Sequence, residues 1–126
     1  MPHKIALKLG VVSLNGTLND SAAAQALAKR LPLEFSVSRW GQEFYGSVPD
    51  GLEISDETGA VDLVDKGALA FWPPGEAFCV FWGKTPASRG DECRPASPVL
   101  VIGSVDGDWK AVDKLGGSIN VKIEKV

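Results

Sequence analysis

Aromatic side chains gather in one part of the sequence, and a few polar side chains lie among them. Eight of the ten aromatic residues fall within positions 40–82: Trp40, Phe44, Tyr45, Phe71, Trp72, Phe78, Phe81 and Trp82. Tryptophan and tyrosine provide flat apolar area with a polar tip, which suits the wall of a binding groove. The same residue types also fill protein cores, so a groove and an ordinary core with scattered surface positions both remain open.

Charged residues flank this aromatic segment. Arg39 and Glu43 lie on either side of Trp40, where they can orient a ligand or simply pair with each other. Adjacent strand residues point to opposite faces, so one member of Phe71-Trp72 and one of Phe81-Trp82 should face the core and the other a groove or solvent. The predicted ligand-binding residues are Arg39, Trp40, Glu43, Tyr45, Trp72, Phe78, Thr85 and Ser88.

Other kinds of chemistry find little support. The single histidine, His3, lies next to the start of the chain, where we expect a solvated tail residue; this argues against histidine-based triads and zinc sites.

Cys79 lies in an apolar run and is predicted to be buried, whereas Cys93 lies in a polar loop and is predicted to be exposed. The two lack metal-binding or redox spacing. Asp106-Gly107-Asp108 is best explained by a turn and a helix cap. We predict no metal and no cofactor, and no catalytic residue can be named.

Charge and hydropathy exclude further classes. The net charge is −3, with 13 basic and 16 acidic residues spread along the chain, so nucleic-acid binding is not expected. Lys8 interrupts the only apolar run near the start that resembles a signal peptide. The longest apolar stretch, 67–82, contains two prolines and a glutamate, which excludes a spanning helix. We therefore predict a cytoplasmic protein without a membrane partner.

Turn residues and apolar periodicity predict many short strands. Glycine and proline supply 22 of the 126 residues, more than a helical bundle uses. Apolar parity changes after Leu9, which places a turn at Gly10-Val11, although Asn15-Gly16 is the stronger hairpin dipeptide. The predicted helices are 22–30, capped within 19–21 and ended by Pro32, and a short one at 109–115. The predicted strands or strand-like runs are 5–9, 12–18, 36–40, 43–48, 52–54, 61–63, 68–72, 78–82, 99–103 and 119–123. These elements predict a mainly β chain: one domain over residues 1–126, folded as a small closed antiparallel barrel with one main and one short helix.

Three segments carry a resemblance to a known family. They are Arg39-Trp40-Gly41-Gln42-Glu43-Phe44-Tyr45, the stretch from Phe71-Trp72-Pro73-Pro74-Gly75 through Phe81-Trp82-Gly83-Lys84-Thr85-Pro86-Ala87-Ser88, and Ala96-Ser97-Pro98-Val99-Leu100-Val101-Ile102-Gly103. Together they resemble the prokaryotic cyclophilin-like family, from about Ile5 to the C-terminus. The resemblance implies a cyclophilin-type β-barrel with helices over its ends. It does not bring the prolyl isomerase motif, because the sequence has no Phe-His-Arg strand; Arg39 is the residue that can take the arginine's role.

Three functions remain open. The first is a module that binds a peptide or small ligand in an aromatic-lined groove. The second is a divergent peptidyl-prolyl cis/trans isomerase, which needs an apolar slot for the ring and a donor near the proline nitrogen. The third is self-association, as a homodimer, through exposed apolar surface.

Overall fold

The chain folds into a closed antiparallel barrel, as predicted from the sequence, and the barrel has eight strands. The computed structural model describes residues 3–54 and 56–126; residues 1 and 2 of the predicted domain, and residue 55, lie outside the described residues. The strands are β1 (His3–Leu9), β2 (Val12–Leu18), β3 (Leu33–Arg39), β4 (Glu43–Ser47), β5 (Ala68–Trp72), β6 (Ala77–Phe81), β7 (Leu100–Asp106) and β8 (Ser118–Lys125). Around the barrel they run in the order β1-β2-β7-β5-β6-β4-β3-β8.

The first hairpin turns at Gly10-Val11, as the change in apolar parity predicted. Leu9 pairs with Val12, and Gly10 has a φ of 60°, a left-handed conformation that glycine adopts without strain. Gly16 instead lies within β2, where a Cβ would come within 2.2 Å of the Ser104 carbonyl oxygen on β7. This glycine therefore permits close strand packing and does not form a turn. His3 begins β1 opposite Leu18, so the expectation of a solvated tail residue is wrong.

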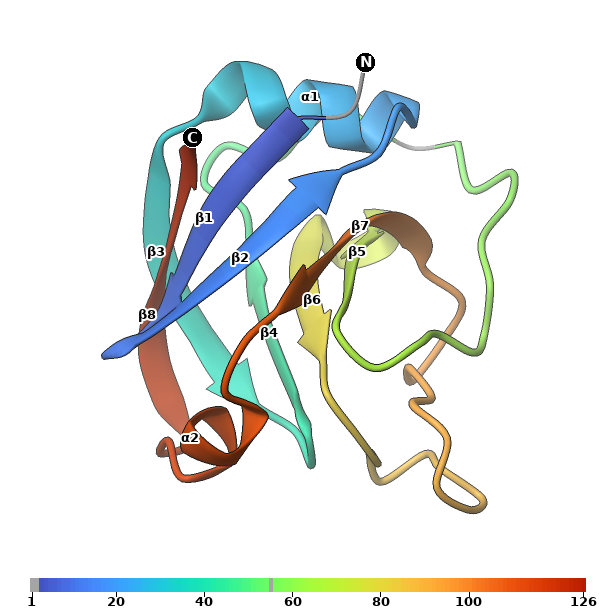
Figure 1. Ribbon diagram of the computed structural model, residues 1–126. Coiled ribbons are helices and arrows are strands. Elements are labelled where there is room, and N and C mark those ends of the chain that lie inside the picture. The colour runs from blue at the N-terminus through green and yellow to red at the C-terminus, as the bar shows by residue number, and fades with distance from the viewer. Residues whose placement is uncertain (1–2, 55) are drawn as a thin grey trace.

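Helices close the two ends of the barrel (Figure 1). Helix α1 (Ala22–Arg30) begins at Ser21, whose side chain accepts a hydrogen bond from the Ala24 amide, and buries Leu27 together with three alanines. The small alanine side chains let the helix pack closely against the barrel. Helix α2 (Trp109–Asp113) is capped by the Asp108 side chain and buries Val112 at the opposite end. A single 3-10 turn, η1 (Pro73–Gly75), joins β5 to β6.

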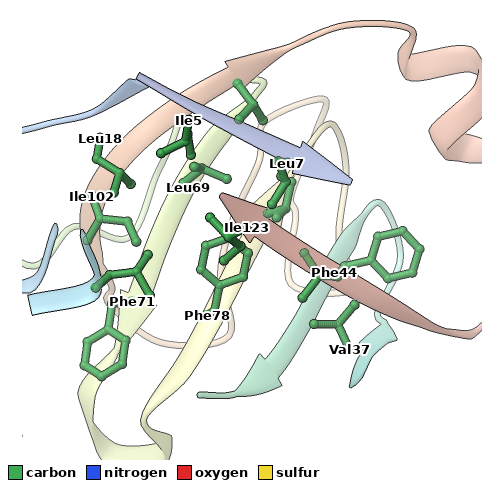
Figure 2. Close-up of a cluster of buried hydrophobic side chains, with 14 of the residues drawn as sticks. Ile5, Leu7, Leu18, Val37, Phe44, Leu69, Phe71, Phe78, Ile102 and Ile123 are labelled. Carbon is green, nitrogen blue, oxygen red and sulfur yellow. The ribbon is translucent and has the colours of Figure 1, made fainter. Parts of the chain in front are cut away.

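Inward-facing side chains from every strand fill the barrel. Figure 2 shows the centre of this core, to which each strand contributes at least one side chain: Ile5, Leu7, Leu18, Val37, Phe44, Leu69, Phe71, Phe78, Ile102 and Ile123. Each is at most 2% exposed. Because side chains alternate along a strand, a core of this kind leaves the residues between these positions on the outer face of the barrel.

The segment 48–67 differs from the sequence-based expectation. No strand forms at 52–54 or 61–63; the chain makes only isolated bridges near 61–63, Val61 with Val99 and Val64 with Cys93. Asp50 and Glu53 have positive φ values, which break the extended backbone that a strand needs. In β7, Val101 is 36% exposed on the outer face. Among the described residues, no helix is long and apolar enough to cross a membrane.

Phe78 was predicted to bind ligand, but it lies inside the barrel, 1% exposed, with its ring 6.0 Å from that of Phe35 in an edge-to-face contact. We expect Phe78→Ala to lower the free energy of unfolding by about 3–5 kcal/mol, because it leaves a cavity in the core. Tyr45→Ala, on the outer face and 43% exposed, should cost less than about 1 kcal/mol. Urea denaturation of both variants measures the difference; equal losses would contradict this placement of Phe78.

Candidate functional site

The outer face of three neighbouring strands carries polar and aromatic side chains. Phe44 points into the barrel, so Glu43 and Tyr45 point outward. Across the sheet, Glu43 pairs with Phe81 and Tyr45 pairs with Cys79 on β6. Ala70 and Trp72 of β5 pair in turn with Cys79 and Ala77 of β6. Strand register therefore places residues from three separate sequence segments on one surface.

A second, smaller apolar cluster covers part of this surface. It consists of Ala70, Ala77, Cys79, Phe81, Cys93 and Val99. Figure 1 shows the connection between β6 and β7 lying beside these strands, outside the barrel. Cys93 is 6% exposed within the cluster, so the prediction of an exposed thiol is wrong. Phe81 points outward as alternation allows but is fully buried by this cover, so it faces neither a groove nor solvent.

The same outer surface holds a cavity of about 290 Å³. Its lining residues are Trp40, Glu43, Tyr45, Trp72, Ala77, Cys79, Pro95, Ala96, Ser97 and Val99. The structure thus brings together four of the eight residues predicted to bind ligand: Trp40, Glu43, Tyr45 and Trp72. Trp40 is held at the rim by a hydrogen bond from its amide to the Glu43 carbonyl oxygen at 2.8 Å. The volume lies close to the lower end of the range for small-ligand sites.

Glu43 is the distinctive group in the cavity. Its side chain is 5% exposed and has Phe81 as its cross-strand neighbour. Burial disfavours the charged carboxylate and raises the pKa of Glu43 to about 8, although a hydrogen bond with the Cys79 thiol opposes the shift. The pKa of Cys79 is raised well above its usual value, first by burial and then by the negative charge of Glu43. The site therefore holds a carboxyl group that ionises near neutral pH and a thiol that stays protonated.

Thr85 and Ser88 do not line the cavity; they hold the loop that forms its wall. The Thr85 hydroxyl donates to the Arg94 carbonyl oxygen, and the Ser88 hydroxyl donates to the Glu92 carbonyl oxygen at 2.6 Å. The Glu92 carboxylate accepts hydrogen bonds from two backbone amides, those of Arg89 and Gly90. These hydrogen bonds lower the pKa of Glu92 to about 2, and the bond from the Arg89 amide contributes most. The network fixes the start of the loop and thus the position of Pro95, Ala96 and Ser97.

Arg39 lies at the α2 end of the barrel and belongs to a different cluster. Its guanidinium donates to Asp113 Oδ1 at 2.7 Å and lies 5.2 Å from the ring centre of Trp82. The indole of Trp82 and the amide of Gln42 also donate to Asp113, and these bonds lower the pKa of that carboxyl. Arg39 therefore pairs with Asp113, so of the two alternatives left open by the sequence, the pairing with Glu43 is wrong.

Sequence reasoning missed six lining residues: Ala77, Cys79, Pro95, Ala96, Ser97 and Val99. Cys79 was correctly predicted to be buried, but the cluster that buries it is the outer one. The small side chains of 95–97 could have indicated a cavity, because a loop of small residues beside aromatic strands leaves unfilled space. Because these residues lie far from Glu43 in the sequence, their proximity to it in the fold was not predicted.

A larger depression of about 620 Å³ lies elsewhere, between β7 and the segment 61–66. Its ionisable side chains, Asp65 and Lys66, are exposed, and its apolar residues include Leu63 and Val101. Exposed charges of this kind are well solvated and give little selectivity. The predicted self-association through exposed apolar surface stays a prediction.

Comparison with known proteins agrees with this geometry. The fold is a closed eight-stranded antiparallel barrel with a helix at each end. The chain belongs to the cyclophilin-like family, whose profile matches residues 3–124, and this confirms the resemblance seen in the sequence. No curated protein sequence matches the chain.

Two solved structures share the fold. The solution structure of the hypothetical protein AF2241 from Archaeoglobus fulgidus has a TM-score of 0.79 and 28% identity, covering 98% of this chain and 95% of that chain. The structure of McbB in complex with tryptophan has a TM-score of 0.65 and 14% identity, covering 95% of this chain. The match spans 44% of the McbB chain, so the likeness concerns the fold alone.

The raised pKa of Glu43 makes stability depend on pH. Below pH 4.5 the carboxyl is protonated in both folded and unfolded chains; as the pH rises toward 8, only the unfolded chain ionises, and stability falls. We expect Glu43→Gln to be more stable than the wild type by about 3 kcal/mol at neutral pH, with the difference vanishing near pH 4. Denaturation of both proteins across this range measures it. A gap that does not change with pH would contradict the raised pKa.

Proposed function

We propose that the protein binds a small apolar or aromatic ligand, or one apolar side chain of a peptide, in the cavity on the outer face of β4, β5 and β6. The observation that carries the proposal is a cavity of about 290 Å³ walled by aromatic side chains around one nearly buried carboxyl group, Glu43. Ligand sites characteristically combine mostly apolar walls with a few placed polar groups.

The cost of keeping Glu43 in this position supports the proposal. A carboxyl group buried beside Phe81 and the outer apolar cluster lowers stability whenever it ionises. Strongly shifted pKa values gather at functional sites because binding and catalysis use them. The aromatic walls provide affinity through apolar area, and Glu43 provides selectivity.

The prolyl isomerase alternative loses its proposed donor. That mechanism needed Arg39 beside an apolar slot, but Arg39 binds Asp113 and is not among the residues that line the cavity. A protease-coupled assay on a proline-containing tetrapeptide tests this alternative. Turnover that is lost in Arg39→Ala would restore it.

Tryptophan emission reports ligand binding directly, because two of the four tryptophans line the cavity and two do not. We expect phenyl-containing probes, such as phenethylamine, phenylethanol and phenylpropanoate, to include at least one that changes the emission of the wild type. Trp72→Phe should reduce this response to less than about half, since it removes a reporter and part of the wall.

Trp109→Phe is the matched control. Trp109 stacks on Trp82 at a centroid distance of 6.4 Å, away from the cavity, so this variant should keep the response. Loss of the response in Trp109→Phe but not in Trp72→Phe would place binding elsewhere. No response to any probe by fluorescence or calorimetry would contradict the proposal.

A further inference from the structure

We infer that the ligand of this cavity is an organic ammonium ion, that is, a protonated amine carried on an apolar or aromatic group. The inference rests on the proposed function, because it names the ligand class for the same cavity. Among the described residues that line the cavity, Glu43 is the one acid, and none is a lysine, arginine or histidine. The only full charge that the walls can present is therefore negative.

No ion pair between described residues neutralises that charge. The ion pairs among the described residues join Arg39 to Asp113, Arg94 to Glu92 and Asp62, and Lys122 to Glu124; none includes Glu43. Those carboxylates lie at partly exposed positions, whereas Glu43 is 5% exposed. A buried carboxylate without a cation is unfavourable, so a ligand that brings its own positive charge gains what the fold does not supply.

The other walls suit the same ligand. Trp40, Tyr45 and Trp72 bring three aromatic side chains to the cavity, and aromatic rings attract ammonium groups through their negative faces. Pro95, Ala96 and Val99 offer apolar surface for the rest of the molecule. An anionic ligand would oppose ionisation of Glu43, and a neutral ligand would gain nothing from it, whereas an ammonium ion pairs with the carboxylate.

Proton release distinguishes an ammonium ligand from a neutral one. At neutral pH, Glu43 holds its proton in the empty cavity; a bound ammonium favours the carboxylate, so the O–H bond breaks and the proton passes to solvent. The other titratable side chains at the site are Tyr45 on β4, Cys79 on β6 and, in the covering loop, Cys93. The pKa values of both thiols are raised, so they stay neutral in the range concerned. A ligand that merely accepts a hydrogen bond from protonated Glu43 releases no proton.

Calorimetric titration with phenethylamine and phenylethanol tests the inference, because the two probes differ only in an ammonium and a hydroxyl group. At about pH 8.5 we expect the amine to bind at least about tenfold more tightly. At about pH 5, where Glu43 is protonated, the two affinities should converge. Near neutral pH, titrations in buffers of different ionisation enthalpy should show proton release with the amine and none with the alcohol.

Glu43→Gln removes the ionisable group but nearly keeps the shape of the side chain. The two probes are therefore compared with each other on the same variant, and its circular dichroism spectrum checks that it is folded. Phenethylamine should lose its advantage of about tenfold and its proton release. If, at about pH 8.5, the alcohol or phenylpropanoate binds the wild type as well as the amine does, or Glu43→Gln leaves the amine's affinity unchanged, the inference is overturned while the proposed function stands. If none of the three probes binds, both are overturned.

Discussion

Strand alternation in a closed barrel is the constraint on which the whole structure depends. Once Phe44, Phe71 and Phe78 face inward, their neighbours Glu43, Tyr45 and Trp72 must face outward. Closure removes the sheet edges and makes the register of each strand depend on all the others. The core packing that stabilises the fold therefore also fixes which side chains meet on the outer surface. A site built in this way lies on rigid strands.

The outer face of β4, β5 and β6 differs from that of β1, β3 and β8. Most outward positions of β1, β3 and β8 carry polar residues in solvent, whereas those of β4, β5 and β6 are small or aromatic apart from Glu43 and lie beside the connection 82–99. Gly41 permits a close approach on this side: a Cβ there would come within 2.8 Å of the Thr85 Cα. The hydroxyl groups of Thr85 and Ser88 hold the start of the connection, and the cavity lies between the strands and residues 95–97.

The sequence allowed the fold to be predicted more fully than the site. Parity placed the first turn at Gly10, and alternation separated Phe71 from Trp72, because both signals are local. The site depends on pairings between distant segments: the register of β4 with β6 brings Glu43 beside Phe81 and Tyr45 beside Cys79, and no local pattern contains it. Closeness in sequence did not predict closeness in the fold. Arg39 and Glu43 are near each other in the chain, but Arg39 lies beside Asp113 and Glu43 lies in the cavity. The loop residues 95–97 could be related to the strands only once the barrel had been built.

The central claim is that Glu43 is a buried carboxyl group whose charge the fold leaves unpaired. The most direct measurement is a carbon-13 NMR titration of the glutamate side-chain carboxyl signals in the ligand-free protein, with Glu43→Gln to assign the resonance. We expect the Glu43 signal to titrate with a midpoint near 8. A midpoint near 4.5, the ordinary value of a glutamate side chain, would contradict the account.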